Sequence, residues 1–293
     1  MQKYFEIRYL PLTIFLTALQ RAELPPYLGS TLRGVIGQAL LQTDKEACTF
    51  LYRNGEKAES RKVIAKPYMV LPPKICMPQT VIEQGEQLKF EFLLFGGGVK
   101  YLSSVIAALE QIDRFGLGAR RYRFELKGIV HSQTQRMVWC RGQYFKEAAT
   151  AAVVPNYELQ NVTGAVIILC TPLRIRHGGQ LMQTLPFQTL IRNITNRIAA
   201  IAERYGGWID KEEAGRVLPL AENIQTVNEA FKVTQLERYS NRINRKMDFS
   251  GLSGRIEYKG ELSPFVPWLY AAQSLHIGRN TTFGMGKIQV YFI

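Results

Sequence analysis

Apolar positions in the first half of the chain follow two periods, which predict alternating strands and helices. After the strand-like stretch FEIRYLPLTIFLTAL, leucine or isoleucine recurs every fourth position from Leu28 to Leu40. This spacing follows a Pro-Pro pair and predicts an amphipathic helix that starts near Tyr27. The charged segment 43–66 that follows is predicted to be a loop.

The remainder of this half adds a second strand, a second helix and a third strand. QLKFEFLLF (87–95) alternates in the manner of a strand, and apolar residues at helical spacing follow it from Leu102 to Ile112. YRFELKGIV (122–130) alternates again. The predicted order is therefore strand, helix, strand, helix and strand.

The second half repeats this order of elements. GAVIILCTPLRIR (164–176) is a predicted strand, and apolar residues from Phe187 to Ile201 define a long helix. Two more strands are predicted around GRIEYKGEL and KIQVYFI, with PFVPWLYAAQSLHIG as a helix between them. The repeated order predicts an α+β fold made of tandem ferredoxin-like (RRM-like) domains.

The junction between these domains is predicted near residue 150. The segment 146–161 is rich in alanine, contains Pro155 and shows no clear period. Such a break in pattern is typical of a boundary. We therefore expect an N-terminal domain over 1–150 and a C-terminal domain over 160–293.

A glycine-rich segment follows the second predicted helix in each half, GLGARR from residue 116 and GRNTTFGMG from residue 278. In the second segment, Gly278, Gly284 and Gly286 let the backbone turn through positive φ and approach another chain or a ligand. Backbone N–H groups there could form an anion-binding nest, flanked by the cations Arg279 and Lys287. We expect this segment to contact a phosphate-bearing ligand.

The charge of the chain favours a polyanionic partner. It has 37 Lys and Arg against 24 Asp and Glu, a net charge of +13, which favours nucleic acid first and anionic membrane surfaces second. No run of about 18 apolar residues occurs, and the N-terminus lacks a signal pattern. Four cysteines without a C-x-x-C spacing argue against zinc ribbons and disulfide scaffolds. We predict a reduced, soluble, cytoplasmic protein with no metal, cofactor or membrane partner.

Two clusters of cations with tyrosines are candidate RNA contacts. RYSNRINRK (238–246) contains no acidic residue, and GARRYR places two arginines beside Tyr122. RNA-binding proteins interleave aromatic and basic residues in this way, although charge runs are more often solvated faces. The candidates are Arg120, Arg121, Arg238, Tyr239, Arg242 and Lys246.

Several segments, in order along nearly the whole chain, carry a family resemblance. They are LPPYLGSTLRGVIGQAL, KPYMVLPP, LLFGGGVKYLSSVIAALEQIDRFGLGARRYRFEL, PLRIRHGGQLMQTLPFQTLIRNI, ERYSNR and GLSGRIEYKGELSPFVPWLYAAQSLHIGRNTTFGMGKI. Together they resemble the CRISPR repeat-RNA processing endoribonucleases of the RAMP superfamily. The resemblance implies ferredoxin-like domains with a C-terminal glycine-rich loop, and a role in antiviral defence.

The activity implied by the resemblance is the metal-independent cutting of CRISPR repeat transcripts into guide RNAs. The 2′-OH of the RNA attacks the adjacent phosphate and leaves 2′,3′-cyclic phosphate and 5′-OH ends. This step needs a base for the 2′-OH, an acid for the departing 5′ oxygen and cations for the phosphorane.

Histidine is the usual base for such a step, and the chain has three. His276 introduces the C-terminal glycine-rich segment at a position where the family often has a histidine. It is the first catalytic candidate, with helix capping and packing as the alternative. His131 is predicted to be a surface residue, and His177, between arginines and glycines, is a candidate phosphate contact.

The first helix departs from the family pattern. Many relatives carry a histidine base in or near this helix, where this chain has Gln38, and an amide cannot accept the proton. Tyr27 and Arg33 are substitute candidates. Tyr27 could shuttle a proton only if cations lowered its pKa, and Arg33 could stabilise the phosphorane but could not act as a base.

These observations favour a CRISPR repeat-RNA endoribonuclease and leave two rivals open. One is a non-catalytic RAMP subunit that holds guide RNA in an interference complex with other CRISPR-associated subunits. The other is a basic two-domain protein with ribosomal or membrane partners. The sequence does not distinguish a monomer from a homodimer.

Overall fold

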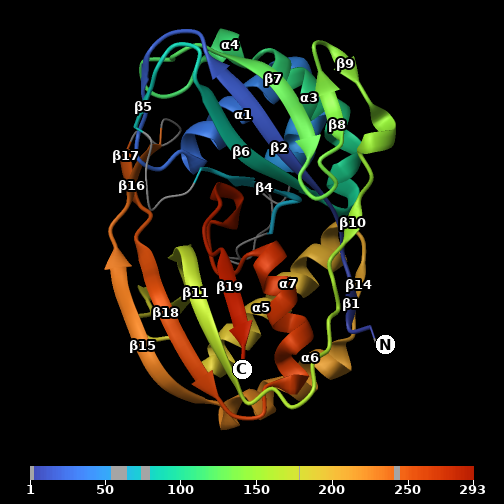
Figure 1. The fold of residues 1–293 in the computed structure, drawn as a ribbon, viewed down its shortest axis with the longest axis vertical. Helices are drawn as coiled ribbons and strands as arrows, with labels where there is room; N and C mark the ends of the chain where they lie inside the picture. The colour runs from blue at the N-terminus through green and yellow to red at the C-terminus, as the bar shows by residue number, and fades with distance from the viewer. Residues whose placement is uncertain (1–2, 54–64, 74–79, 178, 241–244) are drawn as a thin grey trace. The chain divides into compact units, whose positions relative to one another are not determined.

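The computed structural model describes residues 3–53, 65–73, 80–177, 179–240 and 245–293, apart from the side chains of 177, 238–240 and 245–246. The chain forms two compact units. The N-terminal unit is Arg8–Ala152, and the C-terminal unit combines Met1–Ile7 with Val153–Ile293. Figure 1 shows the elements of both.

The sheet of the N-terminal unit is antiparallel, with the strand order β4-β6-β2-β7-β8-β9, and β10 also pairs with β2. The strands β3 and β5 pair with each other and form a separate two-stranded ribbon. The strands are β2 (Arg8–Ala18), β3 (Ala22–Glu23), β4 (Tyr68–Leu71), β5 (Val81–Ile82), β6 (Gln87–Phe95), β7 (Phe124–His131), β8 (Met137–Cys140), β9 (Gln143–Tyr144) and β10 (Ala152–Val153).

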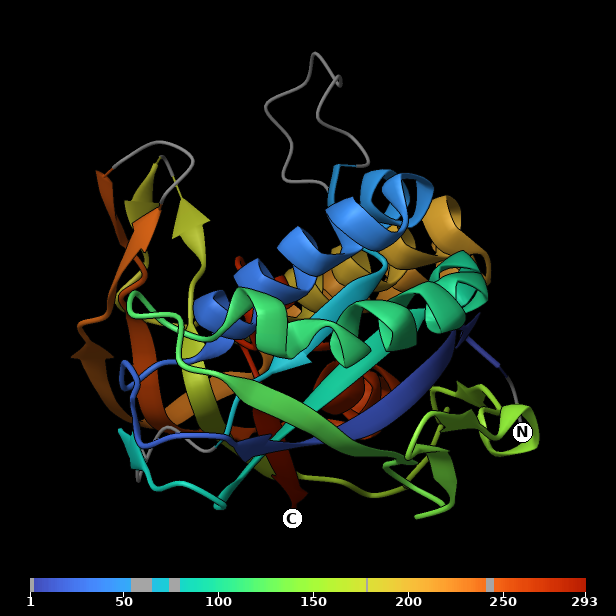
Figure 2. The ribbon, with the colours of Figure 1, turned by 90° about the horizontal axis from the view of Figure 1, so that it is seen from above.

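One face of this sheet is covered by helices. Figure 2 shows α1 and α3 side by side on it. The spaced apolar residues of α1, from Leu32 to Leu40, are buried in the core, as the four-residue period predicts. The helices are α1 (Gly29–Thr43), α2 (Lys45–Cys48), α3 (Leu102–Glu110) and α4 (Ile112–Phe115), with short 3-10 turns at Gly96–Tyr101 and Lys146–Ala148.

The segment predicted as a loop after the first helix begins with helical structure instead. Asp44 accepts a hydrogen bond from the backbone N–H of Ala47 at 2.9 Å and so caps α2, which runs on into a π-helical turn at Thr49–Arg53. The prediction of a loop was wrong for these residues because it overlooked the cap. Residues 54–64 lie outside the described part of the chain.

The C-terminal unit has the same design. Its antiparallel sheet has the order β15-β18-β11-β19, and α5 and α7 pack together and cover one face. The strands are β11 (Gly164–Leu173), β15 (Gln225–Thr234), β18 (Gly251–Lys259) and β19 (Ile288–Phe292), and the helices are α5 (Phe187–Tyr205), α6 (Lys211–Leu220) and α7 (Val266–Leu275). Short 3-10 turns lie at Ala221–Asn223, Ser263–Phe265 and Thr281–Phe283.

Two further hairpins and one strand pair complete this unit. The hairpins join β12 (Arg176–His177) to β13 (Gln180–Leu181) and β16 (Glu237–Ser240) to β17 (Arg245–Asp248). The strand pair joins β1 (Phe5–Glu6) to β14 (Trp208–Ile209). Phe5 is fully buried, with its ring 5.6 Å from that of Trp268, which ties the first residues into this unit.

In each unit the first and third main strands are central and the strands after each helix lie beside them, which is the ferredoxin-like order. The predicted α+β tandem of ferredoxin-like units is therefore confirmed. Among the residues that the structure describes, no helix is long and apolar enough to cross a membrane.

Candidate functional site

The loop that follows α7, from His276 to Lys287, is called here the C-terminal glycine loop. It comes so close to the unit's own backbone that glycine is required. Gly286 has φ +73°, and a Cβ there would collide with the carbonyl oxygen of Ile277. A Cβ on Gly278, at φ +76°, would lie 2.6 Å from the carbonyl oxygen of Arg174. Both glycines are therefore explained by packing within the unit.

Backbone N–H groups of this loop are bonded within the unit. Arg279 donates to the carbonyl of Arg174 at 2.8 Å, and Gly286 donates to that of Pro172 at 3.1 Å. The N–H of Lys287 donates to the hydroxyl of Thr171 at 2.9 Å. These three amides cannot also form the predicted anion nest, so an anion at this loop would depend on side chains and on other amides.

His276 lies at the end of α7 and is buried, with 1% of its surface exposed. Its backbone has φ +53° and its N–H donates to Ala272, which closes the last turn of the helix. Its Nδ1 lies 3.2 Å from the carbonyl oxygen of Met285. A carbonyl only accepts, so Nδ1 carries the proton of the neutral ring.

Burial lowers the pKa of His276 to about 3, and the nearby charges of Lys287 and Arg197 add to this effect. The imidazole is therefore neutral at neutral pH. Arg197, buried in α5, donates from Nε to the carbonyl of Leu275 at 3.2 Å and so bonds the end of the same helix. These contacts favour the capping alternative, and the catalytic role of His276 stays a prediction.

The candidates at the start of α1 belong to the core of the N-terminal unit. Tyr27 is 7% exposed, and burial raises the pKa of its hydroxyl, opposite to the direction that proton transfer requires. The half-buried Arg33 lies 5.0 Å over the ring of Tyr52, whose hydroxyl donates to the Arg33 carbonyl. Gln38 is exposed on the same helix. The roles of Tyr27 and Arg33 in catalysis also stay predictions.

The glycine segment 116–121 of the N-terminal unit is called here the N-terminal glycine loop, and its arginines are exposed. Gly116 (φ +65°) and Arg121 (φ +52°) turn the backbone, and Leu117 pairs with Tyr122 to close the loop. Arg120 and Arg121 both extend into solvent. This loop therefore presents two of the predicted RNA-contacting cations at the surface.

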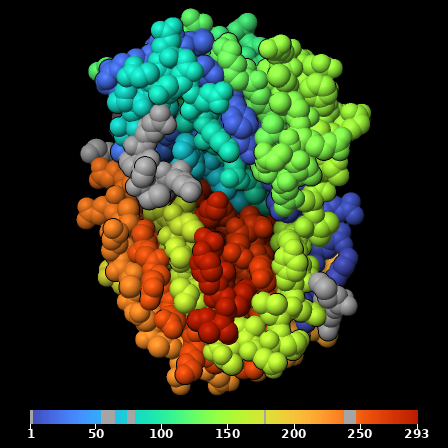
Figure 3. Space-filling model, viewed as in Figure 1, coloured from blue at the N-terminus to red at the C-terminus, as the bar shows by residue number. Residues whose placement is uncertain are grey.

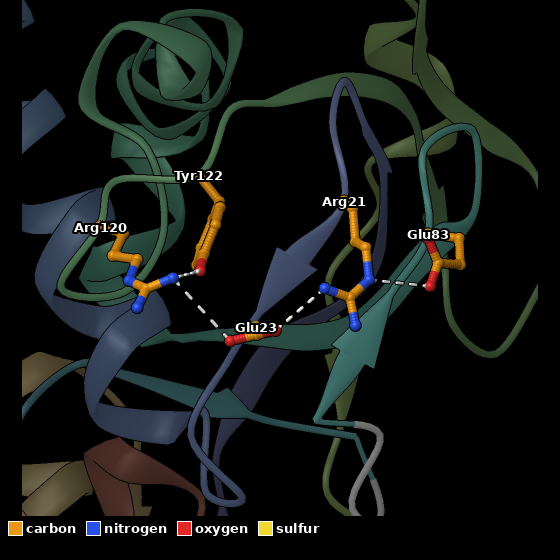
Figure 4. Close-up of polar contacts among 5 residues, drawn as sticks. All are labelled: Arg21, Glu23, Glu83, Arg120 and Tyr122. Atoms are coloured by element: carbon orange, nitrogen blue, oxygen red, sulfur yellow. Dashed lines mark hydrogen bonds and ion pairs between the residues drawn. The ribbon is translucent and has the colours of Figure 1, made fainter.

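A row of ion pairs holds one of these cations (Figure 4). Arg120 lies 4.0 Å from Glu23, which lies 3.0 Å from Arg21, and Arg21 in turn contacts a second carboxylate, Glu83, at 3.2 Å. Arg120 also lies 3.5 Å from the hydroxyl of Tyr122. Such exposed pairs are weak, so a phosphate could replace the carboxylate. Arg21 was missed from the sequence because no other cation or aromatic residue lies next to it.

The other predicted cluster of cations with a tyrosine, residues 238–246, lies on the hairpin β16–β17. Tyr239 is opposite Lys246 in the hairpin register, and Arg238 is opposite Met247. The side chains of Arg238, Tyr239 and Lys246 lie outside the description, as does the whole of Arg242. The four RNA contacts predicted here therefore stay predictions.

A buried arginine joins this hairpin to the C-terminal glycine loop. The Arg174 side chain is 4% exposed, donates to Asp248 at 3.0 Å and also bonds the carbonyl of Ser250. This contact holds the pKa of Asp248 far below its usual range. The carbonyl of Arg174 accepts the N–H of Arg279, as described above. Asp248 and Ser250 also line a shallow hollow of about 640 Å³.

The prediction that His131 lies at the surface was wrong. It is 2% exposed, its Nε2 lies 3.0 Å from the carbonyl of Thr150, and its Nδ1 accepts from the N–H groups of Gln133 and Thr134. These bonds close the turn after β7. The side chain of His177 lies outside the description. Over the described ranges, no three His, Cys, Asp or Glu residues gather as metal ligands would.

Each half of the chain matches a known family model. Residues 167–288 match the family model of the CRISPR-associated endoribonuclease Cas6, and residues 7–152 match a model described as an N-terminal domain. An uncharacterized protein of Archaeoglobus fulgidus is 24% identical over 286 residues, which cover 92% of this chain and 93% of that protein.

Solved Cas6 structures share the fold over almost the whole chain. A Cas6 product complex has a TM-score of 0.62 at 14% identity and covers 97% of this chain and 100% of its own. Thermus thermophilus Cas6 has a TM-score of 0.60 at 12% identity, with 97% and 99% covered. A partial Cas6-RT-Cas1–Cas2 complex has a TM-score of 0.64 at 11% identity, over 98% of this chain and 46% of that one.

Proposed function

We propose that the chain is a CRISPR-associated endoribonuclease of the Cas6 family, whose model its residues 167–288 match, and that it cuts CRISPR repeat transcripts into guide RNAs without a metal ion. The 2′ oxygen bonds to the adjacent phosphorus, the bond from phosphorus to the 5′ oxygen breaks, and the 2′ proton is lost as the 5′ oxygen gains one. The products are a 2′,3′-cyclic phosphate and a 5′-OH end.

The observation that carries this proposal is the extent of the Cas6 match. It includes the whole C-terminal glycine loop, both hairpins and the buried Arg174 that joins them. The net charge of +13 and the exposed arginines of the N-terminal glycine loop supply the cations that an RNA substrate needs. Other CRISPR-associated subunits are further proposed partners.

The described side chains supply no exposed imidazole for this step. His131 and His276 are 2% and 1% exposed, and the pKa of Tyr27 is raised. We therefore propose that cleavage depends on the positioning of the RNA and on fixed cations, with solvent hydroxide taking the 2′ proton. Positioning alone can contribute several orders of magnitude in rate.

The experiment is cleavage of repeat RNA by the purified protein in EDTA. We expect one discrete cut, a product that carries a cyclic phosphate, and a rate that rises about tenfold per pH unit through neutrality. A rate that levels off above pH 7 would indicate an imidazole base, and His177→Ala would then identify it. Intact RNA at every pH would contradict the enzymatic proposal.

A second candidate function is a non-catalytic RAMP subunit that only holds guide RNA. The exposed Gln38 on α1 and the burial of both described histidine side chains favour it. It predicts a salt-sensitive complex with repeat RNA in the same assay, with no cut product. The presence or absence of a cut product in this assay therefore distinguishes the two functions.

A further inference from the structure

The sheet of the C-terminal unit has one face that no helix of the described residues covers. Along β11, Ile167 and Leu169 are buried against the helices, whereas Ile168 between them is 37% exposed. On β19, Val290 is buried and Tyr291 is 48% exposed. This open face lies at the surface in Figure 3, where the yellow-green atoms of β11 adjoin the dark red atoms of β19.

Strand register places an aromatic ring beside aliphatic groups on this open face. Tyr291 is directly opposite Val166. Ile168 is opposite Gln289, the next residue of β19 that faces outward. Neighbouring strands are about 4.8 Å apart, and diagonal neighbours about 7 to 8 Å. The Tyr291 ring therefore has Val166 and Ile168 within reach, and the three form a small apolar platform.

Cations continue the same face onto the next two strands. Arg255 of β18 is opposite Ile168, and Lys232 of β15 is opposite Ser253, two residues along β18 from Arg255. Lys259 lies on the same face, and all three cations are exposed. Within the described chain, none of them has a carboxylate within 4.0 Å, unlike Arg120 and Arg21 in the other unit. Glu257 lies between Arg255 and Lys259 on this face and opposite Val166, so the three cations leave an excess of positive charge beside one carboxylate.

An exposed ring beside an excess of positive charge suits single-stranded RNA. Bases of any sequence stack on an aromatic face, while arginine and lysine contact the phosphates that join them. A stable protein interface usually needs a larger apolar patch, and the described apolar side chains of this face, which include Tyr291, Ile293, Ile168 and Val166, form a small one beside the cations. The excess of positive charge complements RNA.

We propose that this open face binds single-stranded RNA that adjoins the repeat, with one base stacked on Tyr291 and phosphates held by Arg255 and Lys232. The inference rests on the proposed function, because it requires that the protein binds repeat RNA. It adds a contact surface that includes neither glycine loop and predicts that RNA outside the minimal repeat strengthens binding.

The test compares a minimal repeat RNA with the same RNA carrying an oligouridine extension of about eight nucleotides, at either end in turn. We expect one extension to tighten binding to the full-length protein roughly tenfold. Tyr291→Ala should abolish this gain, and Tyr291→Phe, which keeps the ring, should preserve it. A 2-aminopurine in the extension should lose fluorescence on binding to the protein and keep it with Tyr291→Ala.

Charge variants provide an independent readout. Arg255→Ala should lower the slope of log affinity against log salt by about 0.7 for the extended RNA only. Two variants are matched controls: Tyr144→Ala removes a similarly exposed tyrosine from the N-terminal unit, and Arg204→Ala removes an exposed arginine from α5. They should change neither the gain in affinity from the extension nor the slope of log affinity against log salt. Thermal midpoints check that each variant is folded. If Tyr291→Ala fails to fold, Arg255→Glu replaces it.

The outcomes separate this inference from the function on which it rests. No binding of the minimal repeat would overturn both. Binding of the minimal repeat with no gain from either extension would overturn the open-face inference alone. If Tyr291→Ala converts a dimer to a monomer and leaves RNA affinity unchanged, the face is a protein interface and the inference is wrong.

Discussion

The two glycine loops occupy the same position in their units, after the second helix and before the last ferredoxin strand, yet they are built differently. In the N-terminal glycine loop, Gly116 approaches the carbonyl oxygen of Arg121 within the loop itself, and Arg120 and Arg121 extend into solvent. In the C-terminal glycine loop, Gly278 and Gly286 bring the backbone against the unit's own carbonyl groups. One loop presents cations, and the other is part of the packed structure.

The loops differ in their charged side chains more than in their glycines. Positive φ and close approach by backbone of the same unit explain glycines in both loops without any ligand. The exposure of Arg120 and Arg121 has no such packing explanation. Substitution of a packed glycine should therefore lower stability, whereas substitution of the exposed N-terminal arginines should lower RNA binding.

The largest expected effect is on stability, from Gly286→Ala. The new Cβ would collide with the Ile277 carbonyl, so the free energy of unfolding of the C-terminal unit should fall by at least about 3 kcal/mol. Fluorescence of the buried Trp268 during denaturation would measure it. The control is Gly34→Ala in α1, where no atom lies within 4 Å of the new Cβ. That change should stabilise the N-terminal unit by roughly 0.5 to 1 kcal/mol. An unchanged midpoint for Gly286→Ala would refute the packing explanation.

The next effect is the pH dependence contributed by His276. Its pKa is lowered from 6.5 to about 3, so the unfolded chain takes up a proton below pH 6.5 that the folded unit does not. Stability should therefore fall as the pH falls from 6.5 toward 3, by on the order of 2 kcal/mol at pH 5 from this group. The backbone at His276 has positive φ, which asparagine tolerates, so His276→Asn is the variant to use.

His276→Asn should be less stable than the native protein at pH 8 and should lose stability less steeply between pH 8 and pH 5. Denaturation midpoints at several pH values would measure both effects. Cleavage per folded molecule should be unchanged if His276 only caps the helix. Loss of cleavage by a variant that is folded would show instead that the residue is catalytic, as first predicted.

The smallest effect on stability is expected at the N-terminal glycine loop. Replacing Arg120 and Arg121 together by alanine should change the free energy of unfolding by less than about 0.5 kcal/mol, because the side chains are exposed and the ion pair is weak. The same change should lower the slope of log affinity for repeat RNA against log salt by about 1.4, because each of two lost phosphate contacts to a single strand contributes about 0.7. Arg279→Ala in the C-terminal glycine loop should lower this slope by less, because Arg279 is half-buried. An equal effect from Arg279→Ala would remove the distinction between the loops.

Much of the fold could be predicted because the two periods of apolar residues repeat in the same order in both halves. The four-residue spacing from Leu28 to Leu40 and the alternation in QLKFEFLLF correspond to α1 and β6. The helix at α2 was missed because it is only four residues long and depends on one cap, Asp44. The pairing of Phe5 with Ile209 joins residues far apart in the sequence, which no local pattern reveals.

The candidate site was less predictable, since its character depends on burial. The sequence shows His276 next to a glycine segment but not that Met285, Arg197 and Lys287 surround its ring. It likewise shows Arg174 as one of several cations, although Asp248 and Ser250 bury it. The open face could be found only after strand register had placed Tyr291 next to Val166.

The contribution of residues 3–7 to the C-terminal unit bears on how the chain folds during synthesis. The N-terminal unit is inserted between the first strand and the remainder of the other unit. Arg8–Ala152 can therefore fold as soon as it leaves the ribosome, whereas Phe5 must wait for α7 and its Trp268. Until then the apolar side chains of Phe5 and Ile7, which are buried in the folded protein, stay exposed. A C-terminal fragment that begins at residue 153 would lack these side chains and leave a cavity in its own core.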